Sequence, residues 1–195
     1  NQLNGHKPND TFLRRRIEKS ERPGDEQETI GKLINGLDRA AEDLSTLVRY
    51  GQPVELKKQS GVEVDKVLRT VCSSFDEAIV LEPVSKAVQG SFDHFKLTDA
   101  FRWLSSGALK HRQTENGAGD ISVAVKQAGS SSNQAVIEWS GLRQLDHDPF
   151  RAFAGSDEIK LALAAKIIEA HGGSAKFIDK KFVVTLPLLD DQTQT

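Results

Sequence analysis

Cysteine is almost absent from this sequence, which has a single one among its 195 residues. Cys72 therefore has no partner for an intrachain disulfide, and its apolar neighbours predict a buried side chain rather than a nucleophile. This cysteine usage fits a reducing compartment, so we expect a cytoplasmic location. The sequence also lacks an apolar run near the ~20 residues that span a bilayer, and no signal peptide opens it.

An excess of one charge sign is missing as well. The 26 basic and 28 acidic residues leave a formal net charge of −2, so electrostatics gives no reason to expect nucleic acid or an anionic membrane as a partner. The first residue is Asn1 rather than Met, which indicates a fragment or a processed chain and leaves open an upstream sensor or membrane segment. The length suits one ordinary domain or two small ones.

The clearest element is an amphipathic helix near the start of the chain. Its apolar residues recur at steps of three and four and form a heptad seam: Ile30, Leu33, Ile34, Leu37, Ala40, Ala41, Leu44, Leu47 and Val48. Gly51 and Pro53 predict its end. The short helix predicted around residues 12–17 covers only part of this seam. We therefore expect a helical hairpin that forms a four-helix bundle with a second copy.

After Pro53 the pattern changes to short strands that alternate with helices. The expected strands are 54–56, 78–81, 85–88, 121–125, 135–139, 175–178 and 182–186, and the expected helices are 62–71, 92–111 and 156–168. This order favours one mixed sheet with helices packed on one face. The predicted fold is therefore α+β, with a helical hairpin (residues 1–52), an α/β sandwich (residues 53–189) and a disordered polar tail (residues 190–195).

Three segments resemble parts of sensor histidine kinases. Residues 161–173, which end in His-Gly-Gly, and residues 182–187 resemble the last helix and final hairpin of the catalytic domain. Residues 101–110 resemble the asparagine-box helix of that domain, and the heptad helix ending at residues 47–53 resembles the second helix of the dimerisation hairpin. The segments follow the order of the family. The resemblance implies a dimeric hairpin followed by an ATPase domain of the histidine kinase type.

The asparagine box, however, departs from the pattern of the family. Two asparagines one helical turn apart hold Mg²⁺ and the nucleotide phosphates there, and the resemblance places Trp103 and Gly107 at their positions. Neither side chain offers an oxygen, whereas Mg²⁺ needs several in a near-octahedral array. Asp99 falls near the box, but one carboxylate is a poor metal site.

The two glycine-rich motifs of the family are reduced as well. The adenine motif Asp-x-Gly-x-Gly corresponds to Ser140 and Gly141, followed by Leu-Arg. The phosphate loop keeps only Gly155, and the acidic Asp157 and Glu158 that follow would repel phosphate. We therefore expect no nucleotide and no metal cofactor. ATP and Mg²⁺ are the alternative if the chain is an active but divergent kinase.

A chain of this kind without ATP chemistry resembles the histidine phosphotransferases of two-component phosphorelays. These proteins need one neutral imidazole that attacks the aspartyl phosphate of a response-regulator receiver domain. His6 is the candidate phosphoacceptor, although Pro8 stands at a different place from the proline of the family. The alternative, that His6 only lies in a frayed terminus, has at least equal support. The other histidines are expected to be surface, loop or structural residues: His94 and His111 at the surface, His147 in a solvated loop and His171 structural.

Three functions thus stay open at this point. The first is a module that docks response regulators as a phosphotransferase or pseudokinase, with phosphotransferase activity favoured over ATP-dependent kinase activity. The second is a divergent active sensor histidine kinase. The third is a non-catalytic dimeric scaffold. Nucleotide binding separates the second from the others, and phosphate on a histidine separates the first from the third.

The heptad seam gives a first testable prediction. Replacing Leu37 and Leu44 with Glu puts charge into the interface between two copies, at a cost of several kcal/mol, so the dimer should dissociate. Analytical ultracentrifugation should show a dimer for the native chain and a monomer for the variant. A native chain that already sediments as a monomer at micromolar concentration contradicts the bundle.

Overall fold

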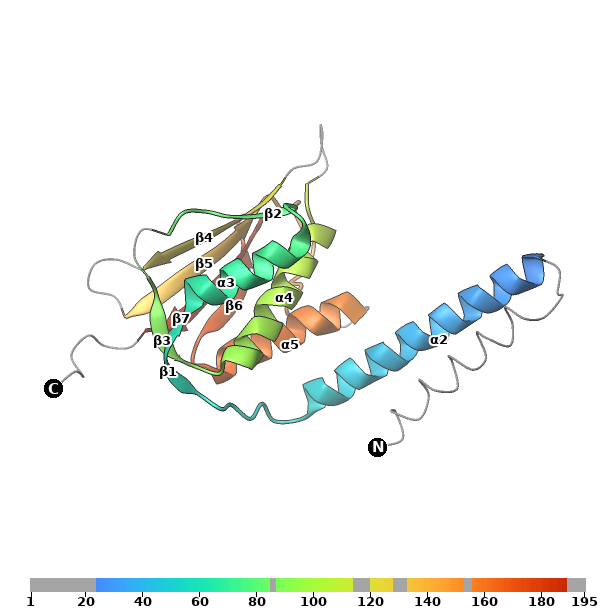
Figure 1. The fold of residues 1–195 in the computed structure, drawn as a ribbon, viewed down its shortest axis with the longest axis horizontal. Coiled ribbons are helices and arrows are strands. Elements are labelled where there is room, and N and C mark those ends of the chain that lie inside the picture. Colours follow the sequence, from blue (N-terminus) through green and yellow to red (C-terminus); the bar gives the residue numbers. More distant parts are fainter. Residues whose placement is uncertain (1–23, 85–86, 114–119, 128–132, 153–155, 189–195) are drawn as a thin grey trace. The chain divides into compact units, whose positions relative to one another are not determined.

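The computed structural model describes residues 24–84, 87–113, 120–127, 133–152 and 156–188, which divide into two compact units on either side of Gly51. The first unit contains the long helix α2 (Gly24–Gly51), drawn in blue in Figure 1. The heptad prediction is therefore confirmed for this helix. The expected partner helix at residues 12–17 and the candidate His6 lie outside the described residues, so the hairpin stays a prediction.

The seam of α2 is largely exposed within one copy of the chain. Ile34 is buried, but five apolar side chains are 45–67% exposed: Leu33, Leu37, Leu44, Leu47 and Val48. Apolar side chains at heptad spacing are stable when another helix covers them. The dimer prediction thus rests on these exposed apolar side chains, which a second copy of the helix would cover.

The second unit consists of short strands and three helices of nine or more residues within its described part. Along the chain they are β1 (Gln59–Glu63), α3 (Val64–Cys72), the short 3-10 turn η2 (Ser73–Phe75), β2 (Ile79–Leu81), β3 (Gln89–Phe92), α4 (His94–Lys110), β4 (Ile121–Gln127), β5 (Gln134–Ser140), α5 (Ser156–Ala170), β6 (Ser174–Ile178) and β7 (Lys181–Pro187). The three predicted helices and the strands around 79, 123, 137, 176 and 184 are confirmed. None of the described helices is long and apolar enough to cross a membrane.

Five of the strands form one mixed sheet in the order β2-β4-β5-β7-β6. β2 runs parallel to β4, and the other neighbours are antiparallel. The last hairpin turns at Asp179 and Lys180, whose φ values of 51° and 58° are those of a type I′ turn. Helices α3, α4 and α5 cover one face of this sheet (Figure 1). The predicted α/β sandwich is therefore present.

Two details of the predicted sheet were wrong. β1 and β3 pair with each other in a separate two-stranded ribbon, so the strands do not form a single sheet. Residues 54–56 form no strand, and the first strand begins at Gln59. The physical reason lies at Lys57, whose backbone N–H donates to the Asp93 carboxylate (2.8 Å). Of the strand expected at 85–88, residues 85–86 lie outside the described residues, residues 87–88 form no strand, and β3 begins at Gln89.

The core lies between the sheet and the three helices. Alternate residues of β5 and β7 face the helices and are fully buried: Ala135, Ile137, Trp139, Phe182, Val184 and Leu186. The indole N–H of Trp139 donates to Ser105 Oγ on α4 (3.1 Å), which satisfies two polar groups inside the core. This arrangement sets the position of α4 over the sheet.

Helix α5 ends at the Gly172-Gly173 pair, as the sequence predicts. Gly172 has a φ of 86°, the left-handed conformation that glycine adopts without steric cost at a helix end. A Cβ on Gly173 would lie 2.1 Å from the carbonyl oxygen of Thr185 in β7. The second glycine therefore allows β6 to start directly against β7.

Candidate functional site

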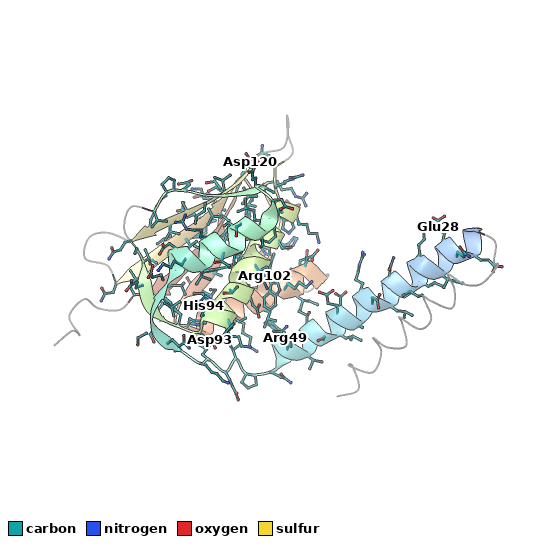
Figure 2. All side chains as sticks on the ribbon, viewed as in Figure 1. Glu28, Arg49, Asp93, His94, Arg102 and Asp120 are labelled. Atoms are coloured by element: carbon teal, nitrogen blue, oxygen red, sulfur yellow. The ribbon has the colours of Figure 1, made fainter. Side chains whose placement is uncertain are left out.

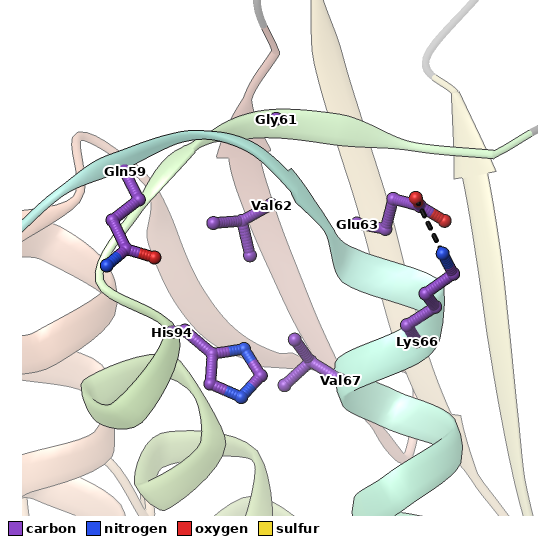
Figure 3. Close-up of a pocket in the computed structure, with 7 residues that line it drawn as sticks. All are labelled: Gln59, Gly61, Val62, Glu63, Lys66, Val67 and His94. Atoms are coloured by element: carbon purple, nitrogen blue, oxygen red, sulfur yellow. Dashed lines mark hydrogen bonds and ion pairs between the residues drawn. The ribbon is translucent and has the colours of Figure 1, made fainter.

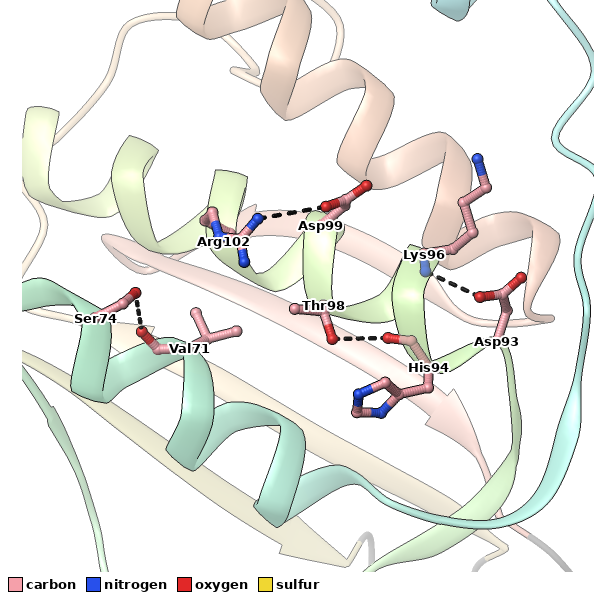
Figure 4. A network of polar contacts seen from close by, with 8 residues as sticks. All are labelled: Val71, Ser74, Asp93, His94, Lys96, Thr98, Asp99 and Arg102. Atoms are coloured by element: carbon pink, nitrogen blue, oxygen red, sulfur yellow. Dashed lines mark hydrogen bonds and ion pairs between the residues drawn. The ribbon is translucent and has the colours of Figure 1, made fainter.

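Helix α4 carries three of the six positions at which the histidine kinase resemblance expects a nucleotide, Asp99, Trp103 and Gly107. It begins at Asp93, whose Oδ1 accepts the backbone N–H of Lys96 (3.0 Å), as in an N-cap. Figure 4 shows this bond, with His94 projecting from the first turn. Burial raises the pKa of Asp93, but the backbone donors Lys96 and Lys57 outweigh burial and hold it below its usual value. The start of α4 is therefore fixed by a buried carboxylate.

His171, at the end of α5, completes this network. Its Nε2 accepts the backbone N–H of Asp93 (3.0 Å), so its Nδ1 carries the proton and donates to the carbonyl oxygen of Ile167 (2.8 Å). Burial is the main cause that lowers the pKa of His171, and the imidazole is neutral. The structural role predicted for His171 is confirmed, because the ring ties the end of α5 to the start of α4.

Gly107 lies on the face of α4 that meets α5. It is buried, and a Cβ at this position would lie 2.7 Å from Cδ2 of Leu161 and 3.0 Å from Cγ of the same residue. An asparagine side chain does not fit here unless Leu161 moves. The second asparagine-box position is thus occupied by a packing contact between two helices.

The other two positions on α4 lie one and two turns earlier. Trp103 is half-buried, and the Asp99 carboxylate lies 3.5 Å from the Arg102 guanidinium at the surface (Figure 4). Figure 2 shows where Arg102 lies on the whole fold. The helix brings Asp99, Trp103 and Gly107 onto one side, as the sequence spacing predicts. Asp99 offers a carboxylate and Trp103 an indole, whereas Gly107 has no side chain. These three positions do not supply a set of oxygen ligands for Mg²⁺.

The adenine-motif positions follow β5. Ser140 is the last residue of the strand, and Gly141 has a φ of 94°. A Cβ on Gly141 would lie 2.9 Å from the carbonyl oxygen of Asp120, and its own carbonyl accepts the N–H of Gln113 (2.8 Å). This glycine serves the chain's own backbone packing. Gly155 lies outside the described residues.

The start of α5 carries acidic residues that pair with neighbouring side chains. The Lys110 ammonium at the end of α4 lies 2.8 Å from the Asp157 carboxylate, and its hydrogen bond lowers the pKa of Asp157. Glu158 Oε1 lies 3.5 Å from His147 Nε2. Acidic side chains at a helix N-terminus compensate its dipole in the way that a bound phosphate would.

His111 corrects the sequence prediction, which placed it at the surface. Its side chain is buried, with 4% exposed. The reason is that the chain after β5 returns along the end of α4, where Arg143 N–H donates to the carbonyl oxygen of His111 (2.9 Å) and Arg112 bridges to Leu142. His94 and His147 are exposed, as predicted. No sequence pattern marked His111 as a core residue.

A shallow pocket of about 210 Å³ lies at the other end of α4 and was not predicted. It is lined by Gln59, Gly61, Val62, Glu63, Lys66, Val67 and His94 (Figure 3). None of the nucleotide-box positions lines this pocket. Among the described residues, no group of three or more His, Cys, Asp or Glu side chains is arranged to hold a metal ion.

The buried His171 network gives a second prediction. The substitution His171→Leu leaves the Asp93 N–H without an acceptor, so the free energy of unfolding at pH 7.5 should fall by roughly 1–3 kcal/mol. The folded-state pKa of His171 lies below its unfolded value of about 6.5, so its contribution is complete above that pH and is lost as the pH falls. Urea titrations at pH 7.5 and pH 5 measure both effects.

The matched control is His94→Leu, which changes an exposed histidine directly after Asp93 and should alter stability by less than about 0.5 kcal/mol. The network interpretation is wrong if His171→Leu is as stable as the native chain at pH 7.5. It is also wrong if the difference in free energy of unfolding between the native chain and His171→Leu grows as the pH falls.

Solved structures with the same architecture include histidine kinases and catalytic domains of histidine kinases. Full-length ShkA in complex with AMPPNP superimposes with a TM-score of 0.62 at 16% identity, over 90% of this chain and 42% of ShkA. The histidine kinase AdeS of Acinetobacter baumannii gives a TM-score of 0.58 at 18% identity, over 91% of this chain and 92% of AdeS. The ATP-binding domain of PrrB from Mycobacterium tuberculosis gives 0.52 at 19% identity, over 68% of this chain and 98% of that domain.

No protein-family model and no curated protein matches the sequence. The chain spans less than half of ShkA but nearly the whole of AdeS. At identities of 16–19% these likenesses establish the fold. They agree with the segments in which the sequence itself resembles the family, and they confirm that this chain has the sensor histidine kinase fold.

Proposed function

We propose that this chain is a two-component signalling module that docks response-regulator receiver domains without using ATP, as a histidine phosphotransferase or a pseudokinase. The fold supports signalling of this type. The observation that carries the ATP-independent part is the contact between Gly107 and Leu161, which fills a position that the family gives to a nucleotide and metal ligand. A homodimer through α2 and a cytoplasmic location belong to the same proposal.

The energetic argument starts from Leu161, which is fully buried. Burying a leucine side chain stabilises a fold by ~1.5–3 kcal/mol. A nucleotide that had to displace Leu161 would therefore bind on the order of ten- to a hundredfold more weakly. The ion pair between Asp157 and Lys110 adds a second obstacle, because phosphate at the start of α5 would face carboxylates.

The proposal predicts that calorimetric titration with Mg-ATP gives no binding heat at millimolar nucleotide. A second titration on Leu161→Ala, which vacates the contact at Gly107, should also give none, since the metal ligands are missing on α4. Thermal unfolding with and without Mg-ATP is an independent measurement. A micromolar dissociation constant for the native chain refutes the ATP-independent function and favours the divergent kinase.

The phosphotransfer chemistry needs little from this chain. A neutral imidazole nitrogen attacks the phosphorus of the receiver's aspartyl phosphate, the N–P bond forms, and the P–O bond to the aspartyl carboxylate breaks. The imidazole proton passes to solvent, and the receiver supplies Mg²⁺ and its acidic pocket. We propose His6 as this nucleophile. His111 and His171 are buried, which makes them unsuitable for attack on a partner.

Transfer to His6 is tested with phosphorylated receiver domains and the full chain. The substitution His6→Gln removes the nucleophile, so uptake of acid-labile phosphate should be abolished, whereas dimerisation and receiver binding should stay within about twofold of native. His94→Gln is the matched control, because His94 is exposed and should leave uptake unchanged.

Each outcome of this experiment selects one function. Uptake that persists in His6→Gln moves the chemistry to another residue. Receiver binding without uptake by the native chain, also in a version extended upstream of Asn1, favours the pseudokinase. The absence of both binding and uptake with every receiver tested leaves the scaffold function.

A further inference from the structure

The end of α4, the start of α5 and residues 141–152 meet around His111. We call residues 141–152 the covering segment. Two backbone hydrogen bonds attach it to the end of α4, from Arg143 N–H to the His111 carbonyl (2.9 Å) and from Gln113 N–H to the Gly141 carbonyl (2.8 Å). Its apolar side chains are buried: Leu142, Leu145 and Phe150. The covering segment is therefore closed over this part of the core.

His111 is buried beneath this segment without hydrogen-bond partners. Neither Nδ1 nor Nε2 has one in the described part of the chain, and Glu158 Oε2 is also buried and unpaired. A neutral imidazole always carries one N–H donor, and burying it unpaired is unfavourable. The closed state therefore tolerates the neutral ring at some cost, and a charge on the same ring would be opposed much more strongly.

Charged groups approach His111 from each element around it. Lys110 belongs to α4, Arg143 and His147 belong to the covering segment, and Asp157 and Glu158 belong to α5. Burial, followed by the Arg143 and Lys110 charges, lowers the pKa of His111, and Glu158 opposes them. The closed structure therefore favours the neutral ring.

We propose that His111 is a pH-sensitive latch: the neutral ring keeps the covering segment closed on α4, and the protonated ring releases it. Protonation places a positive charge in a buried site beside Arg143, and no hydrogen-bond acceptor is in place to receive the second N–H. Opening moves the imidazolium into water and Arg143 away from it. The proton comes from solvent, and no covalent bond changes.

Glu158 does not prevent the release. Its Oε1 lies 3.5 Å from His147 Nε2, and its Oε2 is buried without a hydrogen-bond partner. The Glu158 charge raises the pKa of His111, but burial and the charges of Arg143 and Lys110 outweigh it and lower this pKa. The closed state therefore disfavours the protonated ring despite the nearby carboxylate.

The direction of the pH dependence follows from the two states. In the open state His111 is in water with a pKa near 6.5. In the closed state its pKa is lower, so the open state binds the proton more tightly. The contribution of His111 to closure is complete above about pH 6.5 and decreases as the pH falls toward the closed-state pKa. Acidification then exposes Leu142, Leu145 and Phe150 as an apolar surface.

Amide hydrogen exchange of the full chain, followed by NMR, tests the latch. Between pH 7.5 and pH 5.5 the protection factors of the Arg143 and Gln113 amides should fall by up to about tenfold, the limit that an open-state pKa near 6.5 sets at pH 5.5. The variant His111→Phe keeps an aromatic ring but cannot titrate, and its protection factors should not change with pH at these two amides. His147→Gln is the control and should keep the native pH dependence.

Amides of β5 and β7 separate local release from global unfolding, because they should keep their protection at both pH values in all three proteins. The latch is disproved if Arg143 protection is independent of pH, or if it falls equally in His111→Phe. If His111→Phe does not fold, the native chain still decides the matter. The ring resonances of His111 must then titrate with the same midpoint as the loss of Arg143 protection, and different midpoints overturn the proposal.

Discussion

The close approach of α5 to α4 at Gly107 is the contact on which the second unit depends. Because Gly107 has no Cβ, the Leu161 side chain lies directly against the backbone of α4. At one end of the two helices, this approach lets Lys110 reach Asp157 (2.8 Å). At the other end, it brings His171 to the backbone N–H of Asp93 (3.0 Å). A Cβ at position 107 would lie 2.7 Å from Leu161 Cδ2, so the Leu161 side chain or the two helices would have to shift.

The same contact connects the fold with the proposed function. The resemblance to histidine kinases implies that the corresponding helix face would hold phosphates and a metal ion. Here packing and ion pairs use these positions: Gly107 contacts Leu161, Gly141 approaches the Asp120 carbonyl, and Asp157 pairs with Lys110. These are separate local arrangements on different elements. Their agreement supports the proposal that this chain works without ATP.

The sequence was sufficient for the elements with strong periodicity and clear ends. The heptads of α2, the Gly172-Gly173 end of α5 and the alternation of β5 and β7 each predicted an observed element, because one local interaction dominates there. Pairing between distant residues was not predictable. Residues 54–56 alternate like a strand, but the Asp93 carboxylate binds the backbone at Lys57, and that carboxylate is 36 residues away. The separate β1–β3 ribbon follows from the same kind of long-range constraint.

The histidines show why a site needs the three-dimensional arrangement. His171 follows a recognisable helix end, so its structural role was evident, whereas His111 stands in an unremarkable polar stretch and is buried only because the covering segment returns over it. Both rings are neutral in the fold, but one has two hydrogen bonds and the other has none. Protonating His171 breaks bonds that stabilise the whole sandwich, while protonating His111 acts on a single surface segment. The difference in partners, rather than a difference in burial, therefore separates a structural histidine from one suited to regulation.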